Sequence, residues 1–223
     1  MNICLSHIIS QSTPSYGNRD KIFIRSNSSI AAGSFANSSC WIFSNNHIGT
    51  HMDSPYHFCE NGKKTFEIPI SNFFFYKVGV IDLPCTGAKL IDATDIENLD
   101  SIDEDIDLLL IRTGFEKFRT EEKYWNDYPG LMPEPADYFR EKFIGLRCVG
   151  FDFISLTSWK FRPEGKLSHQ EFLCPGGGDR SILIIEDMAL DKVRAGLVKV
   201  IVAPLFVEDG NGGAVTVFSE VED

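Results

Sequence analysis

The sequence has no excess of positive charge. Its 223 residues include 21 Lys and Arg against 32 Asp and Glu, so the formal net charge is −11. Proteins that bind nucleic acids or anionic membrane surfaces recognise phosphate groups with clustered Lys and Arg. We therefore expect neither a nucleic-acid partner nor a membrane partner for this chain.

A membrane-spanning segment is also missing. The longest strongly apolar run covers residues 198–207 and is interrupted by Lys199 and Pro204. It is about half the ~20 residues that a spanning helix needs. The first basic residue is Arg19, so there is no basic region of the kind that opens a secretory signal. We expect a cytoplasmic protein.

Paired cysteine motifs are absent as well. The six cysteines include no Cys-x-x-Cys pair, and their spacing is wide and irregular. In a chain without a secretory signal, such cysteines are typical of reduced thiols. We therefore expect free thiols at all six positions, which are Cys4, Cys40, Cys59, Cys85, Cys148 and Cys174.

What the chain does have is the composition of a folded domain. Hydrophobic residues make up 43% of the chain, aromatic residues 12% and charged residues 24%, with no internal repeat or low-complexity tract. Such a chain can bury a sizeable core, which excludes disorder as its main state. Its length fits one domain, or at most two small ones, and we expect a single domain over residues 1–223.

Short apolar and β-branched runs dominate the pattern of secondary structure. Several are continuous rather than alternating, such as residues 108–111, and this is typical of strands that are covered on both faces. The runs predict nine strands. We place them at residues 3–9, 21–25, 40–45, 76–83, 107–112, 148–154, 181–186, 199–207 and 214–219.

Helical patterns are fewer. Two prolines and an acid in the first turn favour a helix start and predict a helix over residues 133–143. Shorter helices are expected at residues 92–99 and 187–195, whereas residues 159–178 contain enough Pro and Gly to predict a long loop. Many strands with a few interleaved helices predict an α/β fold, bordering on α+β, with a mixed sheet.

Three of the five histidines fall within residues 47–57. The imidazoles of His47 and His51 and the carboxylate of Asp53 form a natural three-ligand set for a divalent metal, with positions left for water and substrate. Pro55 limits any helix there, so we place the motif where a strand ends in a turn. The alternative is a set of ordinary surface or core histidines.

A second group of candidate site residues lies downstream. His169 follows the expected loop, and Glu186 ends an apolar strand. A buried carboxylate without a partner costs on the order of several kcal/mol, so we expect Glu186 to meet a metal, a histidine or a backbone amide, unless it is exposed or purely structural. Cys59 could be a further ligand, although we expect a bystander thiol. His7 is expected to be a core histidine.

Aromatic side chains are plentiful. Tyr16, Trp159 and Phe161 could line a pocket, although core packing is the more common role for any one aromatic residue in such a chain. The aromatic segment at residues 73–76 is a candidate subunit contact or a plain core strand.

The motif H-x-G-T-H-x-D-x-P-x-H, complete at residues 47–57, resembles the hallmark of the cyclase family of metal-dependent hydrolases. This family includes bacterial kynurenine formamidase and isatin hydrolase. The resemblance extends over nearly the whole chain. Further similar segments are Leu5-Ser6-His7, Thr13-Pro14, Ile68-Pro69, residues 80–82, residues 110–114, residues 128–131, residues 150–152, His169 and Glu186-Asp187.

The resemblance implies a swivelling β/β/α fold and a homodimer or homotetramer. It also implies a divalent metal, Zn or Mn, held by His47, His51 and Asp53. His57 would act as an acid and base, or would bind a second metal together with His169 and Glu186. The glycine-rich segment between His169 and Glu186 is longer than is usual in the family, so the pairing of these two residues stays open.

The function implied is a metal-dependent hydrolase that cleaves a carbon–nitrogen bond other than a peptide bond in a small-molecule amide. The favoured substrate is an aryl formamide such as N-formylkynurenine, with His57, His169 and Glu186 as catalytic candidates. One alternative is hydrolysis of a cyclic amide or imide. Another is a non-catalytic protein that binds a metal or a small molecule, although pure binding would not need the proton shuttle that His57 offers.

Overall fold

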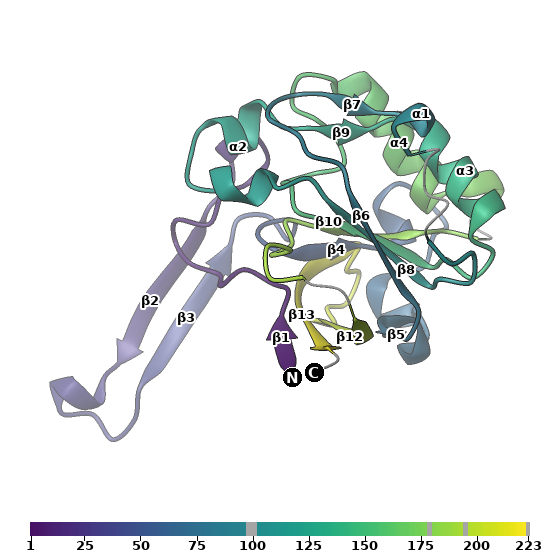
Figure 1. Cartoon of the computed structure of the whole chain (residues 1–223). Helices are drawn as coiled ribbons and strands as arrows, with labels where there is room; N and C mark the ends of the chain where they lie inside the picture. Colours follow the sequence, from purple (N-terminus) through teal and green to yellow (C-terminus); the bar gives the residue numbers. More distant parts are fainter. Residues whose placement is uncertain (97–101, 178–179, 194–195, 222–223) are drawn as a thin grey trace.

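A curved, mixed sheet of nine strands forms the centre of the computed structural model (Figure 1). The structure describes residues 1–96, 102–177, 180–193 and 196–221. The strand order is β5-β12-β13-β4-β11-β10-β8-β6, with β1 beside β13. These strands are β1 (Asn2–Cys4), β4 (His51–Asp53), β5 (Phe74–Phe75), β6 (Val78–Asp82), β8 (Leu108–Arg112), β10 (Cys148–Phe151), β11 (Leu183–Glu186), β12 (Leu197–Pro204) and β13 (Gly212–Val221).

Smaller elements surround this sheet. Two further two-stranded sheets are formed by β2 (Ile22–Ser28) with β3 (Ser38–Phe43), and by β7 (Leu90–Ile91) with β9 (Gly130–Leu131). The described α-helices are α1 (Ala93–Ile96), α2 (Lys123–Asn126), α3 (Glu134–Lys142) and α4 (Arg162–Leu173). None of the helices within these ranges has the length and apolarity to cross a membrane. The expected α/β class, with a mixed sheet and few helices, is confirmed.

The parallel strands β6, β8, β10 and β11 are covered on both faces, as their continuous apolar runs predict. Alternate side chains of β8 enter two separate cores: Leu109 and Ile111 face one, and Leu108 and Leu110 face the other. Helix α3 supplies Phe139 and helix α4 supplies Phe172 to the first core, and the two helices cover that face of the sheet (Figure 1). The sheet curls so that β12 and β13 cover the second core.

Each predicted strand has a counterpart in the structure, although β1 already ends at Cys4. The helix predicted over residues 133–143 is confirmed as α3. The helix expected over residues 92–99 appears as the single turn α1, and positions 97–99 lie outside the described residues. The sequence patterns missed the very short strands β5, β7 and β9, because two residues are too few to show a period.

The loop expected over residues 159–178 is wrong, because most of it forms α4. Pro163 lies in the first turn, where its missing N–H has no intrahelical partner to lose. Gly165 lies buried against Thr157, and a Cβ atom at this position would come within 2.4–2.5 Å of Thr157 atoms. Pro163 and Gly165, two of the Pro and Gly residues that suggested a loop, therefore serve the start of the helix and its close packing.

The helix expected over residues 187–195 is also wrong within the described residues, which end at 193 in this stretch. Asp187 has a φ of 54°, in the left-handed region, and this ends the strand without starting a helix. The backbone N–H groups of Met188 and Ala189 donate to the carbonyls of Phe151 and Leu5, and Met188 forms an antiparallel bridge with Ser6, so this stretch is held beside β10 and the segment after β1.

The expectation of six free thiols is wrong for one pair, because Cys59 and Cys174 form a disulfide. They are 115 positions apart in the sequence, and the fold places their Cα atoms 5.3 Å apart. Their spacing in the sequence could not reveal this proximity. Among the described residues the free cysteines are Cys4, Cys40, Cys85 and Cys148.

Replacing Gly165 with alanine tests the close packing of α4. Glycine to alanine inside a helix ordinarily stabilises it by roughly 0.5–1 kcal/mol. Here the added methyl group meets Thr157, so we expect a net loss of about 1–3 kcal/mol in the free energy of unfolding, measured with urea. Gln170→Ala, at an exposed position of the same helix, is the control and should change stability by less than about 0.5 kcal/mol. Equal stability of the two variants would contradict this account.

Candidate active site

The six predicted site residues line one cavity of about 430 Å³. Its other walls include the aromatic side chains Tyr16 and Phe58. The fold therefore brings together side chains from the segment before β4, from β4 itself, from the turn after it, from α4 and from the end of β11. The six residues are His47, His51, Asp53, His57, His169 and Glu186.

Strand β4 supplies two of these side chains. His51 and Asp53 are two residues apart and therefore point to the same face of the strand, whereas Met52 points into the second core. The antiparallel register of β11 and β4 sets Glu186 opposite His51, and His51 Nε2 lies 3.2 Å from Glu186 Oε2. The turn Pro55–His57 follows directly, which confirms the expected strand end passing into a turn.

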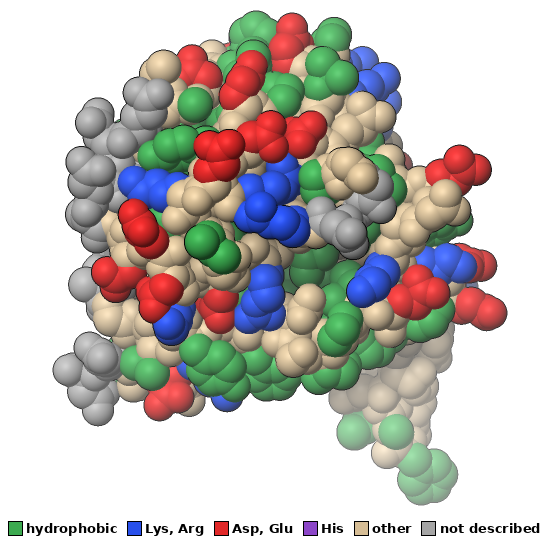
Figure 2. All heavy atoms as spheres, turned by 90° about the vertical axis from the view of Figure 1, so that its right-hand side faces the viewer, with side chains coloured by type: hydrophobic (Ala, Val, Ile, Leu, Met, Phe, Trp, Pro, Cys, Tyr) green, Lys and Arg blue, Asp and Glu red, His purple; other side chains and the backbone are tan. Residues whose placement is uncertain are grey.

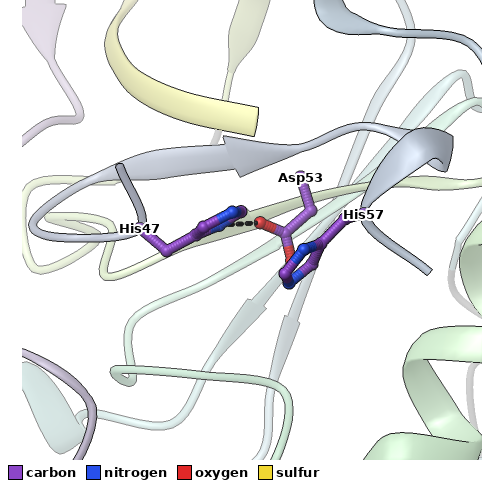
Figure 3. A group of neighbouring side chains, drawn as sticks. All are labelled: His47, Asp53 and His57. Atoms are coloured by element: carbon purple, nitrogen blue, oxygen red, sulfur yellow. Dashed lines mark hydrogen bonds and ion pairs between the residues drawn. The ribbon is translucent and has the colours of Figure 1, made fainter. Parts of the chain in front are cut away.

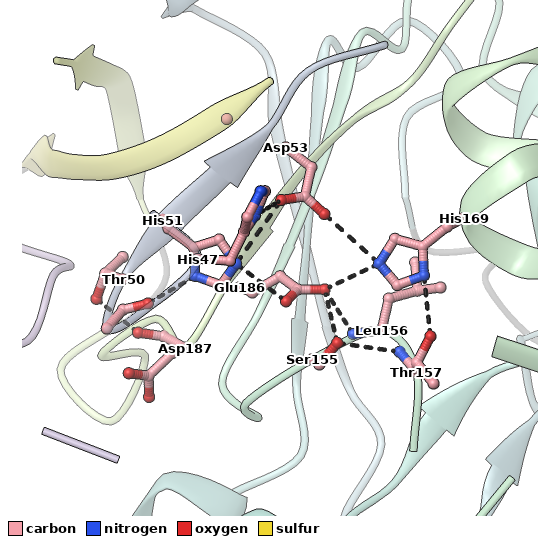
Figure 4. A network of polar contacts seen from close by, with 12 residues as sticks. His47, Thr50, His51, Asp53, Ser155, Leu156, Thr157, His169, Glu186 and Asp187 are labelled. Atoms are coloured by element: carbon pink, nitrogen blue, oxygen red, sulfur yellow. Dashed lines mark hydrogen bonds and ion pairs between the residues drawn. The ribbon is translucent and has the colours of Figure 1, made fainter. Parts of the chain in front are cut away.

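Hydrogen bonds outside the cavity orient two of the imidazoles (Figure 4). Nδ1–H of His51 donates to the carbonyl of Gly49 at 2.7 Å. Nδ1–H of His169 donates to the carbonyl of Gly165 at 2.9 Å and also lies 3.0 Å from Thr157 Oγ1. In both rings Nε2 is left facing the carboxylates, and His169 Nε2 lies 3.5 Å from both Asp53 Oδ2 and Glu186 Oε1. Such outer bonds set which ring nitrogen is available to a metal or a proton.

His47 and His57 form the outer side of the cluster (Figure 3). Nε2–H of His47 donates to Asn211 Oδ1 at 3.0 Å, and its Nδ1 lies 2.8 Å from Asp53 Oδ1. The ring of His57 stacks on that of His47, with centroids 4.1 Å apart. One nitrogen or oxygen atom from each of His47, Asp53 and His57 lies within 4.8 Å of the others.

Glu186 has the partners that a buried strand-end carboxylate requires. Its Oε1 accepts hydrogen bonds from the backbone N–H of Leu156 at 2.7 Å and from Ser155 Oγ at 3.3 Å. Its side chain is 4% exposed, so the alternative of an exposed carboxylate is wrong. His169 and Glu186 lie side by side despite the long glycine-rich segment between them, with His169 Nε2 3.5 Å from Glu186 Oε1.

Burial and neighbouring charges shift the pKa values of several groups in the cluster away from their ordinary values. Burial opposes ionisation of Glu186, as does the charge of Asp53, but hydrogen bonds from His169 and His51 lower its pKa to about 2. Burial alone would lower the imidazole values, yet the two carboxylates raise the pKa of His51 to about 9 and that of His169 to about 10. Burial lowers the pKa of His57 to about 4.

The donor set fits a divalent cation. Asp53 and Glu186 are almost fully buried, and within the described ranges no Lys or Arg forms an ion pair with either of them. Buried carboxylates need compensating positive charge, which here comes from imidazolium protons or from a bound cation. Imidazole nitrogen with carboxylate oxygen suits Zn²⁺ or Mn²⁺. Asp53 belongs both to the group with His47 and His57 and to the group with His51 and Glu186.

The sequence did not reveal the buried contacts of Asp187 with Arg119 and Tyr124, which lie behind the cavity and which we call the clamp. The carboxylate of Asp187 is fully buried and accepts two hydrogen bonds from Arg119, at 2.7 and 2.9 Å, and one from Tyr124. Its backbone carbonyl accepts a hydrogen bond from Thr50 Oγ1 at 2.6 Å (Figure 4). These contacts hold the left-handed backbone between Glu186 and the following turn. The only signal of the clamp in the sequence was a second acidic residue, Asp187, directly after Glu186 at the end of a strand.

Other expected site residues fall outside the cluster. Tyr16 lines the cavity and packs edge-on against Trp159, whereas Phe161 is not among the lining residues. Cys59 is in a disulfide, which agrees with its expected role as a bystander to the ligands. His7 lies outside the cavity, with its Nε2 3.9 Å from a Glu116 oxygen, and burial lowers its pKa.

Comparison with known proteins identifies the family. A family model described as "Putative cyclase" matches residues 3–157. The chain belongs to the cyclase family. A family relative, the kynurenine formamidase of Bacillus cereus, is 30% identical over 173 residues, which cover 76% of this chain and 73% of the relative. An uncharacterized protein of Haemophilus influenzae is 34% identical over 110 residues, covering 48% of this chain and 78% of that protein.

Solved structures share the fold. Isatin hydrolase A from Labrenzia aggregata has a TM-score of 0.81 at 22% identity, covering 100% of this chain and 94% of that one. A predicted metal-dependent hydrolase from Bacillus stearothermophilus has a TM-score of 0.74 at 22% identity, covering 98% and 97%. At these identities the likeness concerns the fold alone.

Removing the carboxylate of Asp187 tests the clamp. Asp187→Ala leaves the guanidinium of Arg119 and the hydroxyl of Tyr124 without their buried partner, so we expect a loss of about 3 kcal/mol in the free energy of unfolding. Asp82→Ala is the control, because it breaks an exposed ion pair with Arg112 and should cost less than about 1 kcal/mol. Thermal unfolding followed by circular dichroism measures both, and similar losses in the two variants would refute the clamp.

Proposed function

We propose that this protein is a metal-dependent hydrolase that cleaves an aryl formamide such as N-formylkynurenine. The main supporting observation is the convergence of four imidazoles and two buried carboxylates in one cavity. The relationship to kynurenine formamidase, at 30% identity over three quarters of the chain, supports the reaction class. The reaction breaks a carbon–nitrogen bond that is not a peptide bond and releases an aromatic amine.

His47, His51 and Asp53 are the proposed ligands of the metal, and Glu186, His169 and His57 are the remaining side chains that could bind a second one. A divalent cation held there would lower the pKa of a water molecule and polarise the carbonyl that the water attacks. The hydrogen bond from Nδ1–H of His51 to the Gly49 carbonyl supports this role. It leaves Nε2 as the ring nitrogen at which a cation can take the place of a proton.

His57 is the proposed proton carrier. It lies at the edge of the cluster, its ring stacked on His47 and edge-on to Phe58. An imidazole in this position can take a proton from the attacking water and pass it to the departing nitrogen. His169 Nε2 lies 3.5 Å from Glu186 Oε1, and this contact keeps the carboxylate of Glu186 facing the cavity.

The mouth of the cavity supports an aromatic, negatively charged substrate. Arg162 lies 3.6 Å above the Trp159 ring, and Arg19 lies over the rings of Tyr16 and Trp159. Neither arginine forms an ion pair with a carboxylate in the part of the chain that the structure describes. Both also line the cavity together with Lys166. N-formylkynurenine combines an aromatic formamide with a carboxylate, and so matches both features.

A cyclic amide or imide is the second candidate substrate, because the same attack opens a ring and the planar substrate fits the same aromatic walls. A non-catalytic binding protein is the third possibility. Turnover separates the three, so the test is a panel of N-formylkynurenine, isatin and cyclic imides with added Mn²⁺ or Zn²⁺.

Metal content tests the ligand assignment. Protein purified without chelator should contain about one metal per chain, or two if the second group is also filled. His51→Ala and Asp53→Asn should lose most of this metal in elemental analysis, because each removes a buried donor, Asp53 from both groups and His51 from the group with Glu186. His7→Ala, whose ring lies outside the cavity, is the control and should retain the parental content. Parental metal content in both site variants would overturn the assignment.

Turnover tests the reaction and the role of His57 together. We expect the parent to hydrolyse N-formylkynurenine faster than isatin, and His57→Asn to lose about 10²–10⁴ in kcat while keeping its metal. Loss of metal in step with activity would make His57 a ligand instead of a proton carrier. Activity above about a tenth of parental would show that His57 does not carry the proton. A parent protein with bound metal and no turnover on any member of the panel would contradict the proposed hydrolase.

A further inference from the structure

A second cavity, of about 580 Å³, shares no lining residue with the candidate active site. We call it the basic cavity. Its walls come from the loop after the turn Pro55–His57, the segment before β5, the end of α3 with the start of β10, and the segment that leads into β11. A cavity of this volume falls within the range that holds small molecules in proteins, roughly 300–1,000 Å³.

The charge of the basic cavity is opposite to that of the chain. Four basic residues line it, and no Asp or Glu of the described chain does. With 32 acidic residues against 21 basic ones, composition alone does not predict such a set. Figure 2 shows Lys and Arg side chains gathered around a hollow in the middle of the face that it presents. The four basic residues are Lys63, Arg140, Arg147 and Arg180.

Two of these cations have no anionic partner. Within residues 1–96, 102–177, 180–193 and 196–221, neither Lys63 nor Arg180 forms an ion pair. Arg180 donates one guanidinium N–H to the carbonyl of Arg140, which leaves its other N–H groups for a ligand. Arg147 binds Asp107 and two backbone carbonyls through its Nη atoms, so its Nε–H is also available. The cavity therefore offers several charged donors that the fold itself does not use.

Arg140 fixes the position of Arg180. The side chain of Arg140 is buried, and its guanidinium binds the carboxylates of Asp137 and Glu171. Its Nε–H donates to the carbonyl of Arg180 at 3.2 Å, and Arg180 donates back to the carbonyl of Arg140. This reciprocal pair holds Arg180 at a φ of 64°, a left-handed conformation that is uncommon for a residue with a side chain. Fixing the backbone beforehand lowers the entropic cost of binding a ligand there.

A phosphate group matches these donors. It carries more negative charge and more acceptor oxygens than a carboxylate does, and guanidinium groups bind it with paired hydrogen bonds. The remaining wall is apolar and includes Ile68, Leu146 and Leu183, which are almost fully buried. This wall provides contact area for an organic group attached to the phosphate.

We propose that the basic cavity binds the phosphate monoester of a small molecule, with Arg180 and Lys63 as its main contacts to the phosphate. Such an occupant would lie behind the turn that carries His57. Pro55, the first residue of this turn, lines the basic cavity, and the backbone N–H of Tyr56 donates to the carbonyl of Lys63 at 3.1 Å. The proposal does not depend on the proposed function.

Isothermal titration calorimetry with inorganic phosphate and phenyl phosphate tests the site. Both should bind the parent saturably, and phenyl phosphate should bind at least as tightly because its ring adds contact with the apolar wall. Arg180→Gln and Lys63→Gln should each weaken binding by about tenfold or more, since each removes a charged hydrogen-bond donor. Arg25→Gln, at an exposed position outside the cavity, is the matched control and should keep the parental affinity. Arg162→Gln should keep it as well, because Arg162 lines the candidate active site instead.

Hydrogen exchange on the parent protein gives a second measurement that needs no variant to fold. Amides of residues 56–63 should gain protection when phenyl phosphate is added, whereas amides of β2 and β3 should not change.

Four results would overturn the proposal. The first is no saturable binding of either compound up to about 10 mM. The second is parental affinity in both Arg180→Gln and Lys63→Gln, and the third is loss of binding in Arg162→Gln. The fourth is phenyl phosphate binding more weakly than inorganic phosphate, which would mean that the cavity does not accept an ester. Unchanged exchange at residues 56–63 on saturation would place the bound compound elsewhere and would likewise count against it.

Discussion

Two buried carboxylates, Asp53 and Glu186, set the main constraint on this structure. They lie on adjacent antiparallel strands in the middle of the sheet, where both are almost fully buried. Unpaired, each would destabilise the fold by several kcal/mol, on the order expected for a buried charge. The four imidazoles around them remove this cost and leave a site where a divalent cation can replace protons.

The rest of the fold keeps these groups in place. Coverage of both sheet faces makes β11 and its neighbours rigid, so Glu186 has a fixed position at the strand end. The disulfide joins Cys59, two residues after His57, to Cys174, directly after α4, the helix that carries His169. The Arg119–Asp187 ion pair holds the backbone behind Glu186. The packing of the sheet, the disulfide and the ion pair thus each hold a different part of the site in place.

Much of the fold and most of the site could be predicted. Continuous apolar runs located the strands because burial on both faces leaves no room for polar residues in them. The failures occurred where a residue had a role that local rules do not describe. Gly165 looked like a loop residue because only its contact with Thr157 explains it. Asp187 looked like a helix start, but its carboxylate is bound by Arg119, which lies 68 positions earlier.

The sequence by itself determined the donor set at residues 47–57, because alternation along a strand places His51 and Asp53 on one face whatever the rest of the chain does. Only the tertiary structure decided that Glu186 and His169 complete it, because a strand register and a helix position join residues that are far apart in the chain. The same holds for the Cys59–Cys174 pair and for the exposure of the hairpin formed by β2 and β3. Distances between distant segments depend on packing, and no local pattern contains them.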